Sequence, residues 1–169
     1  MLDEVEIKDI KYLFNKFEDD LKKNDFDRFF DECNKRIVPI GTFFIDELGM
    51  NFEKLIERYP DLLDIQACFK NCENLKNASI RNFDRLEIQS IFFFGCEKLE
   101  EFYSDAEYIK VLPNGFSGCT PYLLKINIPN CKEIDFGENY FIATVGTTFI
   151  CKPECKIITL SNDYKRKDI

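Results

Sequence analysis

A short motif recurs four times in this chain at an almost constant interval. Each copy has a phenylalanine three residues before a small residue, which we name the slot residue. Successive slot residues are 24, 23 and 25 positions apart, and they are Cys72, Cys96, Cys119 and Thr144. A repeat of this length predicts a solenoid, in which each unit forms one coil and buries its apolar face only by stacking on its neighbours.

Further apolar positions keep the same phase. Ten residues before the slot residue stand Leu62, Leu86, Ile109 and Ile134, and three before it stand Phe69, Phe93, Phe116 and Phe141. Six residues after it, Ala78, Phe102 and Ile150 are expected to point inward in their units. The third unit needs a one-residue insertion, which turns Leu123, Ile126 and Ile128 inward. Short strands after each slot residue are expected to pair in parallel, about 4.8 Å apart.

Amphipathic helices are predicted before the repeats. Apolar residues at spacings of three and four favour a helix over residues 3–23. Asp25 is expected to cap a second helix, which Pro39 stops. Residues 51–59 indicate a third helix, which ends at Pro60.

The chain is therefore expected to combine helices with a parallel-strand solenoid, an α/β (α+β) fold. Residues 1–60 would form a helical N-terminal cap or interaction region, and the apolar run at 37–45 a degenerate first turn. Residues 61–160 would form the solenoid, with a last edge strand at 156–160. Residues 161–169 would form a loosely ordered polar tail whose Lys and Arg residues discourage edge pairing.

The phrase Phe-x-x-Cys-x-x-Leu, followed by Ile-x-Ile-Pro, resembles BspA-like leucine-rich repeats, the 23-residue subclass of the leucine-rich repeat superfamily. The resemblance covers about residues 62–155, and residues 111–129 are the closest stretch. It implies a short leucine-rich-repeat solenoid that recognises proteins, without catalysis or cofactor. Thr144 in place of cysteine and the insertion in the third unit depart from the pattern.

In such repeats, the strand residues that point away from the core usually line the binding face. Counting five, seven and nine residues beyond the slot residue, and allowing for the insertion, we obtain nine candidates for protein binding. Tyr103 and Phe149 are the expected anchors, because aromatic residues dominate interface hot spots. An ordinary solvated face is the alternative. The candidates are Asn77, Ser79, Arg81, Glu101, Tyr103, Asp105, Lys125, Asn127 and Phe149.

The chain has eight cysteines and no histidine. The first residues lack an apolar signal core, so we expect reduced thiols and a cytoplasmic location, or the host cytoplasm for an effector or phage protein. Two Cys-x-x-x-Cys pairs, at 68–72 and 151–155, have the spacing of zinc ligands. They would lie roughly 14 Å apart in the solenoid, too far for one zinc ion. We therefore expect no metal, no cofactor and no enzyme, since the commonest general base is absent.

The chain has a net charge of −8, and residues 1–60 hold 15 acidic and 10 basic residues. A net acidic surface disfavours direct nucleic-acid binding. The mixed charges on the polar face of 3–23 disfavour membrane binding. We expect one protein partner with a basic surface, and a narrower version is an acidic inhibitor that occludes such a surface. A thiolate metal or redox protein and a structural subunit of an assembly stay open as alternatives, as does the oligomeric state.

Overall fold

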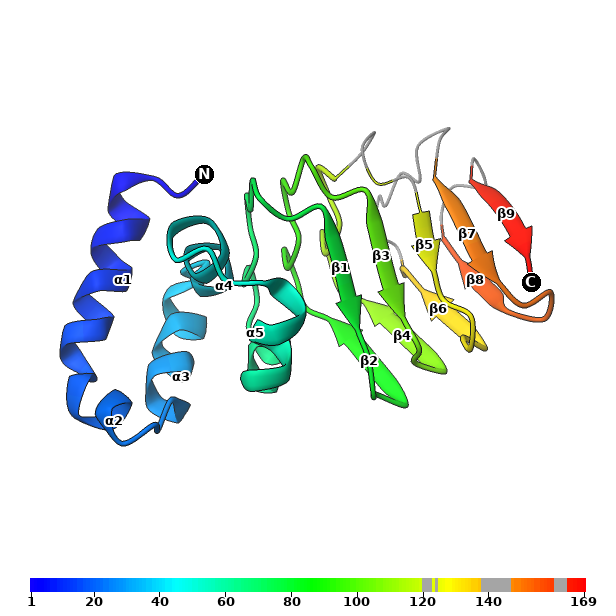
Figure 1. The fold of residues 1–169 in the computed structure, drawn as a ribbon. Helices are drawn as coiled ribbons and strands as arrows, with labels where there is room; N and C mark the ends of the chain where they lie inside the picture. The colour runs from blue at the N-terminus through cyan, green and yellow to red at the C-terminus, as the bar shows by residue number, and fades with distance from the viewer. Residues whose placement is uncertain (120–122, 124, 138–146, 160–163) are drawn as a thin grey trace.

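The computed structural model describes residues 1–119, 123, 125–137, 147–159 and 164–169. Helices gather at the N-terminal end, and parallel strands form a short solenoid over the rest of the chain (Figure 1). The predicted fold class, a parallel-strand solenoid with an N-terminal helical region, is therefore confirmed.

Seven helical segments occupy the N-terminal part of the described chain. They are α1 (Glu4–Lys16), α2 (Glu18–Lys22), α3 (Asp27–Arg36), α4 (Ile40–Thr42), the π-helix η1 (Phe43–Glu47), α5 (Phe52–Arg58) and the 3₁₀-helix η2 (Pro60–Asp64). Of these, α5 packs beside the first strand of the solenoid, where it covers an edge that would otherwise be open (Figure 1).

Two parallel sheets form two sides of the solenoid. Sheet A contains, in spatial order, β1 (Asn77–Ile80), β3 (Glu101–Ser104), β5 (Lys125–Asn127), β7 (Thr148–Cys151) and β9 (Lys165–Asp168). Sheet B contains β2 (Arg85–Ile88), β4 (Tyr108–Val111), β6 (Glu133–Asp135) and β8 (Lys156–Ile158). The chain alternates between the sheets, so each coil gives one strand to sheet A and then one to sheet B.

Turns that contain the repeated phenylalanines form the third side. The amide of Phe69 donates to the carbonyl of Phe92 (3.0 Å), and the amide of Phe93 donates to the carbonyl of Gly115 (2.7 Å). These bonds join each turn to the same turn of the next coil. Coils are thus hydrogen-bonded to one another on all three sides.

Two positions have the left-handed backbone conformation in each of the three repeated turns that the structure describes. Five residues before the slot residue stand Ala67, Ile91 and Asn114, and one residue before it stand Asn71, Gly95 and Gly118, all with φ between 55° and 79°. Gly95 has a φ of 71°, which glycine adopts without strain, and a Cβ there would also displace the side-chain oxygen of Asn71. The repeated turn therefore depends on backbone geometry as well as on apolar columns.

The predicted phenylalanine column is confirmed over the coils that the structure describes. The rings of Phe69 and Phe93 are stacked with centroids 6.0 Å apart, and those of Phe93 and Phe116 are stacked at 5.3 Å. All three side chains are fully buried. Burying one such side chain stabilises a fold by about 1.5–3 kcal/mol. Phe141 lies outside the described residues, as do Thr144 and Tyr122.

The slot cysteines bond to the preceding coil as well as fill the core. The thiol of Cys96 donates to the carbonyl of Phe69 (2.9 Å), and that of Cys119 donates to the carbonyl of Phe93 (3.0 Å). Burial raises the pKa of the Cys96 thiol, which keeps it protonated and able to donate. The slot thus needs a small side chain with a donor.

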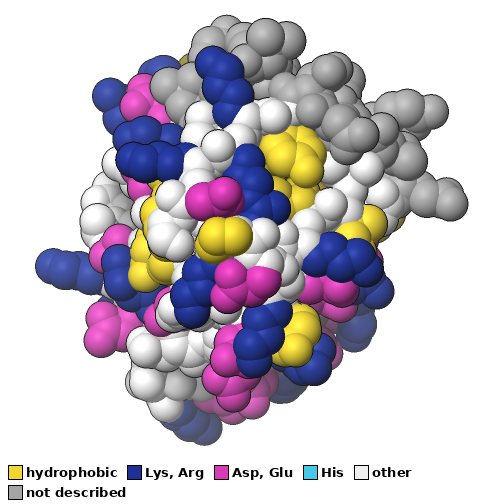
Figure 2. Space-filling model, turned by 90° about the vertical axis from the view of Figure 1, so that its right-hand side faces the viewer, with side chains coloured by type: hydrophobic (Ala, Val, Ile, Leu, Met, Phe, Trp, Pro, Cys, Tyr) yellow, Lys and Arg dark blue, Asp and Glu magenta, His cyan; other side chains and the backbone are white. Residues whose placement is uncertain are grey.

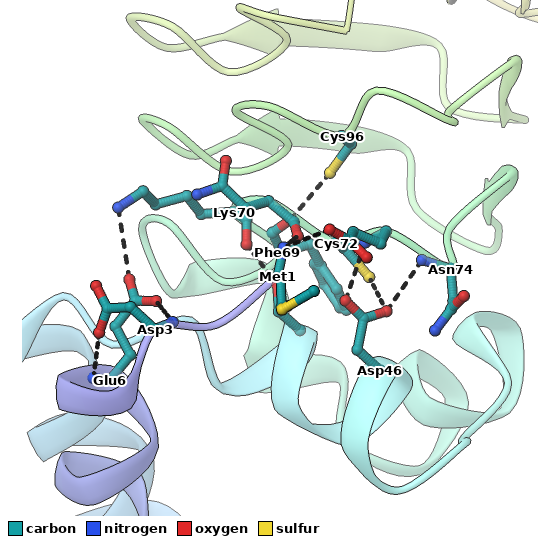
Figure 3. Close-up of polar contacts among 12 residues, drawn as sticks. Met1, Asp3, Glu6, Asp46, Phe69, Lys70, Cys72, Asn74 and Cys96 are labelled. Atoms are coloured by element: carbon teal, nitrogen blue, oxygen red, sulfur yellow. Dashed lines mark hydrogen bonds and ion pairs between the residues drawn. The ribbon is translucent and has the colours of Figure 1, made fainter.

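Asp46 of η1 replaces the missing coil at the N-terminal end (Figure 3). Its carboxylate accepts the thiol of Cys72 (3.4 Å) and the amides of Glu73 (2.9 Å) and Asn74 (3.0 Å). In the same view, Lys70 pairs with Glu6 of α1 (3.5 Å). The first coil therefore has partners on its outer side, as a solenoid end requires.

Several expectations for the helical region need correction. The helix expected over 3–23 is interrupted at Phe17 into α1 and α2, and Asp3 caps α1 in a reciprocal capping box with Glu6. The run at 37–45 is largely helical rather than a coil, although the amide of Thr42 donates to the carbonyl of Cys68 (3.1 Å) and so extends the ladder of turns. Ile37, which falls within the second predicted helix, is instead 47% exposed and has a φ of 54° at the end of α3.

The C-terminal end is also more ordered than expected. The edge strand expected over 156–160 is β8, but part of the expected loose tail forms β9, which pairs with β7. Arg166 lies opposite the inward-facing Phe149, and its guanidinium donates to the carbonyls of Pro153 (2.6 Å) and Cys155 (3.0 Å). Figure 2 views this end and shows Lys and Arg side chains interspersed with acidic and hydrophobic ones.

Candidate protein-binding surface

The structure brings most of the predicted site residues together on the outward face of sheet A. One column of this face runs across the strands through Asn77, Glu101, Lys125, Thr148 and Lys165. The next column holds Ser79, Tyr103, Asn127, Ile150 and Lys167. Of the other three candidates, Arg81 and Asp105 directly follow β1 and β3. Sequence spacing therefore placed eight of the nine candidates on or beside one surface.

Phe149 was wrongly assigned to this face. Its side chain is 0% exposed, and its ring lies against those of Phe136 (6.0 Å between centroids) and Tyr164 (5.0 Å). Counting from Thr144 put the last strand out of phase by one residue, which turns every side chain to the opposite face. Ile150, expected to point inward, occupies the outward position instead.

Tyr103 is held in place by Arg81. The guanidinium carbon of Arg81 lies 4.2 Å from the centroid of the Tyr103 ring, and its Nε donates to Oγ of Ser79 (3.1 Å). The three side chains therefore form a connected group across β1 and β3. An aromatic ring that is half-buried and already positioned loses little conformational entropy when a partner covers it.

Asp105 has a structural partner on this surface. Its Oδ1 accepts the amide of Asn82 (2.9 Å), a residue with a φ of 69° at the corner that follows β1. The carboxylate therefore supports the corner of the neighbouring coil. The residue itself is half-buried.

A groove between α5 and β1 continues this surface. It has a volume of about 400 Å³, with Ile56 and Phe83 as its apolar lining and Glu53 and Glu57 as its acidic rim. Arg81 lines its opposite wall, so the groove meets the group around Tyr103. Sequence reasoning missed it because nothing in the spacing of residues 51–59 shows where α5 packs. The one sequence feature that could have indicated the groove is the pair Glu53 and Glu57, which lie one helical turn apart on α5.

Charge is unevenly distributed over the molecule. Lys125, Lys165 and Lys167 are exposed on the C-terminal half of sheet A and form no ion pair with the described residues. Residues 1–60, by contrast, hold 15 acidic and 10 basic residues. The chain as a whole is therefore negatively charged, but the C-terminal half of sheet A is locally basic.

On the sheet B side, two ion pairs link neighbouring coils. Lys132 pairs with Glu107 (2.8 Å), and Lys156 pairs with Glu133 (3.5 Å). Tyr108 lies under the guanidinium of Arg85, whose carbon is 4.3 Å from the ring centroid. This arrangement resembles that of Arg81 and Tyr103, and it provides a matched control on the opposite face.

Comparison with protein-family models, with curated proteins and with solved structures finds no match. The established description is thus the fold itself, a parallel-strand solenoid with a helical cap. Along the described part of the chain, no helix is long and apolar enough to cross a membrane.

The cysteines are buried, and none forms a disulfide. Burial raises the pKa of Cys33 to about 12 and that of Cys151 to about 11. A hydrogen bond from Cys155 lowers the pKa of Cys131 and raises that of Cys155 itself. Within the described residues, no group of three or more Cys, Asp or Glu side chains has the arrangement of a metal site.

Proposed function

We propose that this chain is a non-enzymatic protein-binding module, a BspA-like leucine-rich-repeat solenoid that binds one protein partner. Sheet A and the groove beside α5 form its binding surface. The observation that carries the proposal is the group of Ser79, Arg81 and Tyr103, which joins the outward columns of sheet A to a groove of about 400 Å³.

The repeat architecture supports the leucine-rich-repeat assignment. Phenylalanine stacking, left-handed turn positions and thiol-to-carbonyl bonds recur together in successive coils. Solenoids of this type expose a long face whose side chains vary freely, because the core columns alone hold the fold. Here that face spans four strand spacings, or about 19 Å.

The acidic helical cap adds a second element to this proposal. Its excess of acidic residues would steer a partner with a basic patch towards the molecule. In the inhibitor version of the proposal, the cap covers that basic patch while sheet A contacts a neighbouring part of the same partner. Eight free cysteines suit a reducing compartment, so we place this interaction in the cytoplasm of the source cell or of a host.

The test begins with affinity purification that uses the full chain as bait, followed by mass spectrometry of the retained proteins. Binding of the principal retained protein is then compared between the parent chain and a variant with Arg81→Glu and Tyr103→Ala. We expect affinity to fall by at least about tenfold, since a positioned aromatic residue is a typical hot spot. The melting temperature should change little, because both residues lie at the surface.

The matched control is the variant with Arg85→Glu and Tyr108→Ala on sheet B, which removes the same kind of pair from the opposite face. It should keep parental affinity. Equal loss in both variants, or unchanged binding of the sheet A variant, would contradict the proposed surface. A chain that retains no protein would contradict the proposed function as a whole.

A further inference from the structure

We infer that the C-terminal half of sheet A binds an extended, acidic segment of the partner protein. The contact residues are Lys125 on β5 and Lys165 and Lys167 on β9. We name this surface the lysine face. The inference rests on the proposed function, and it adds the chemistry of the segment that the module recognises.

The spacing of the three amines suits an extended chain. Lys125 and Lys165 stand in one column with β7 between them, which separates their backbones by about 9.6 Å. Lys165 and Lys167 are two residues apart on one strand, or about 6.7 Å. An extended segment advances about 3.3 Å per residue, so three to four residues reach all three amines.

These amines are also available to a partner. All three side chains are exposed, and none forms an ion pair with the residues that the structure describes. Lys132 and Lys156 on the sheet B side are already paired with glutamates. The lysine face therefore presents three positive charges, free of ion pairs with the described residues, on one surface of a chain that is acidic as a whole.

An apolar contact lies within the lysine face. Ile150 on β7 is half-buried at an outward position, between Asn127 on β5 and Lys167 on β9. A partner segment with acidic residues on both sides of an apolar one would satisfy the lysines and cover Ile150 together. Polar groups at the rim and an apolar contact at the centre are the usual arrangement of protein interfaces.

The strand that presents two of these lysines is held firmly. Arg166, between them, bonds with its guanidinium to the carbonyls of Pro153 and Cys155 and to Oδ1 of Asp168 (2.7 Å). Lys165 and Lys167 consequently project from a fixed edge. A fixed edge reduces the conformational entropy that binding would otherwise cost.

A protein segment suits this surface better than a nucleic acid. Nucleic-acid binding depends on many Lys and Arg residues that neutralise phosphates, whereas this face offers three lysines. Glu101 stands directly beside Lys125 in the same column. A repeating phosphate chain would meet that carboxylate, but a peptide can place a polar or basic residue there.

The test uses a random dodecapeptide library displayed on phage and panned against the full chain. We expect the enriched peptides to contain at least two acidic residues near an apolar one. Affinity of a fluorescein-labelled enriched peptide is then measured by anisotropy. The variant with Lys125→Glu, Lys165→Glu and Lys167→Glu should bind it at least about tenfold more weakly, because each like-charge contact opposes binding.

The matched control changes three exposed lysines of the helical cap, in the variant with Lys11→Glu, Lys23→Glu and Lys54→Glu. It shifts the net charge by the same amount, and these lysines also lack ion pairs with the described residues. Affinity for the labelled peptide should stay within about twofold of the parent, since cap charges lie beyond the Debye length of about 10 Å. Circular dichroism checks that both triple variants are folded.

Five results would contradict the inference. Enriched peptides without acidic residues would do so, as would equal weakening in both triple variants. Binding of a labelled 20-nucleotide single strand as tight as that of the peptide would assign the lysine face to nucleic acid. Peptides that lose affinity only with Arg81→Glu and Tyr103→Ala would keep the proposed function and reject the lysine face. Failure to enrich any peptide would count against both.

Discussion

At the residue scale, the repeated turn depends on two backbone positions that a hydrophobic pattern does not show. Ile91 occupies one of them with a φ of 60°, where Asn114 stands in the next coil. A β-branched side chain is strained in this region, at a cost of about 1–3 kcal/mol. Asparagine enters it several times more readily than most residues. The amide of Ile91 donates a hydrogen bond to the carbonyl of Pro113 (3.1 Å) in the next turn, and this bond offsets part of the strain.

We therefore expect Ile91→Asn to stabilise the protein by about 1 kcal/mol, because the left-handed strain is relieved while only a partly buried side chain is lost. Urea denaturation followed by circular dichroism measures the free energy of unfolding. Ile158→Asn, in the ordinary strand backbone of β8, is the control and should not stabilise. A lower stability of Ile91→Asn would mean that packing of the isoleucine outweighs its strain.

The assignment of Phe149 failed at this scale for a related reason. The columns at Phe69, Phe93 and Phe116 could be found because cysteine marks the phase of each coil. In the last unit threonine fills the slot, and one residue of drift in the count reversed the faces of a whole strand. Sequence spacing therefore predicts which side chains point inward only in units where a cysteine fixes the phase of the repeat.

At the element scale, the two ends of the solenoid are closed by polar side chains from neighbouring segments. Asp46 closes the N-terminal end and Arg166 the C-terminal end, each by bonds to several backbone groups. Neither role was visible in the sequence, because an Asp-Glu pair after an apolar run and a Lys-Arg-Lys tail have no periodicity. β9 forms because β7 offers a free row of backbone groups, which outweighs the low strand preference of its residues.

Asp46→Ala should therefore destabilise the protein by about 1.5–3 kcal/mol, since two amides and a thiol lose a charged acceptor. Thermal denaturation measures the effect. Glu47→Ala provides the matched control, because the side chain of this exposed neighbour forms no hydrogen bond or ion pair with the described residues. It should leave the melting temperature unchanged. Equal stability of the two variants would show that the helices themselves, rather than the carboxylate, close the first coil.

At the scale of the whole molecule, the two ends of the solenoid differ in whether a second molecule can pair with them. Helices cover the N-terminal end, whereas β9 is an edge strand that could pair with another molecule (Figure 1). Its three consecutive basic residues, with Arg166 at the inward position, are the kind of charge that opposes edge-to-edge association. This end is thus expected to keep the module from polymerising.

Replacing Arg166 tests whether its charge prevents association through β9. Arg166→Leu should give a mass that increases with protein concentration, because an apolar residue at the open end favours stacking of a second molecule. Light scattering coupled to size exclusion measures the mass. Lys167→Leu, on the outward face of the same strand, is the control and should leave the mass constant. Constant mass for Arg166→Leu would show that β9 is not the protected end.

The thiol bonds between coils have a consequence for how such a chain changes in length. Each inner coil donates through its cysteine to the coil before it and accepts from the coil after it, so every coil presents the same two surfaces to its neighbours. Duplication of one whole repeat in the gene would therefore insert a coil with all its partners in place. A one-residue insertion or deletion within a strand would instead exchange its core and solvent faces, whereas between strands it can be absorbed, as in the third unit. The outward face of sheet A therefore lengthens by one strand with each complete repeat that is added.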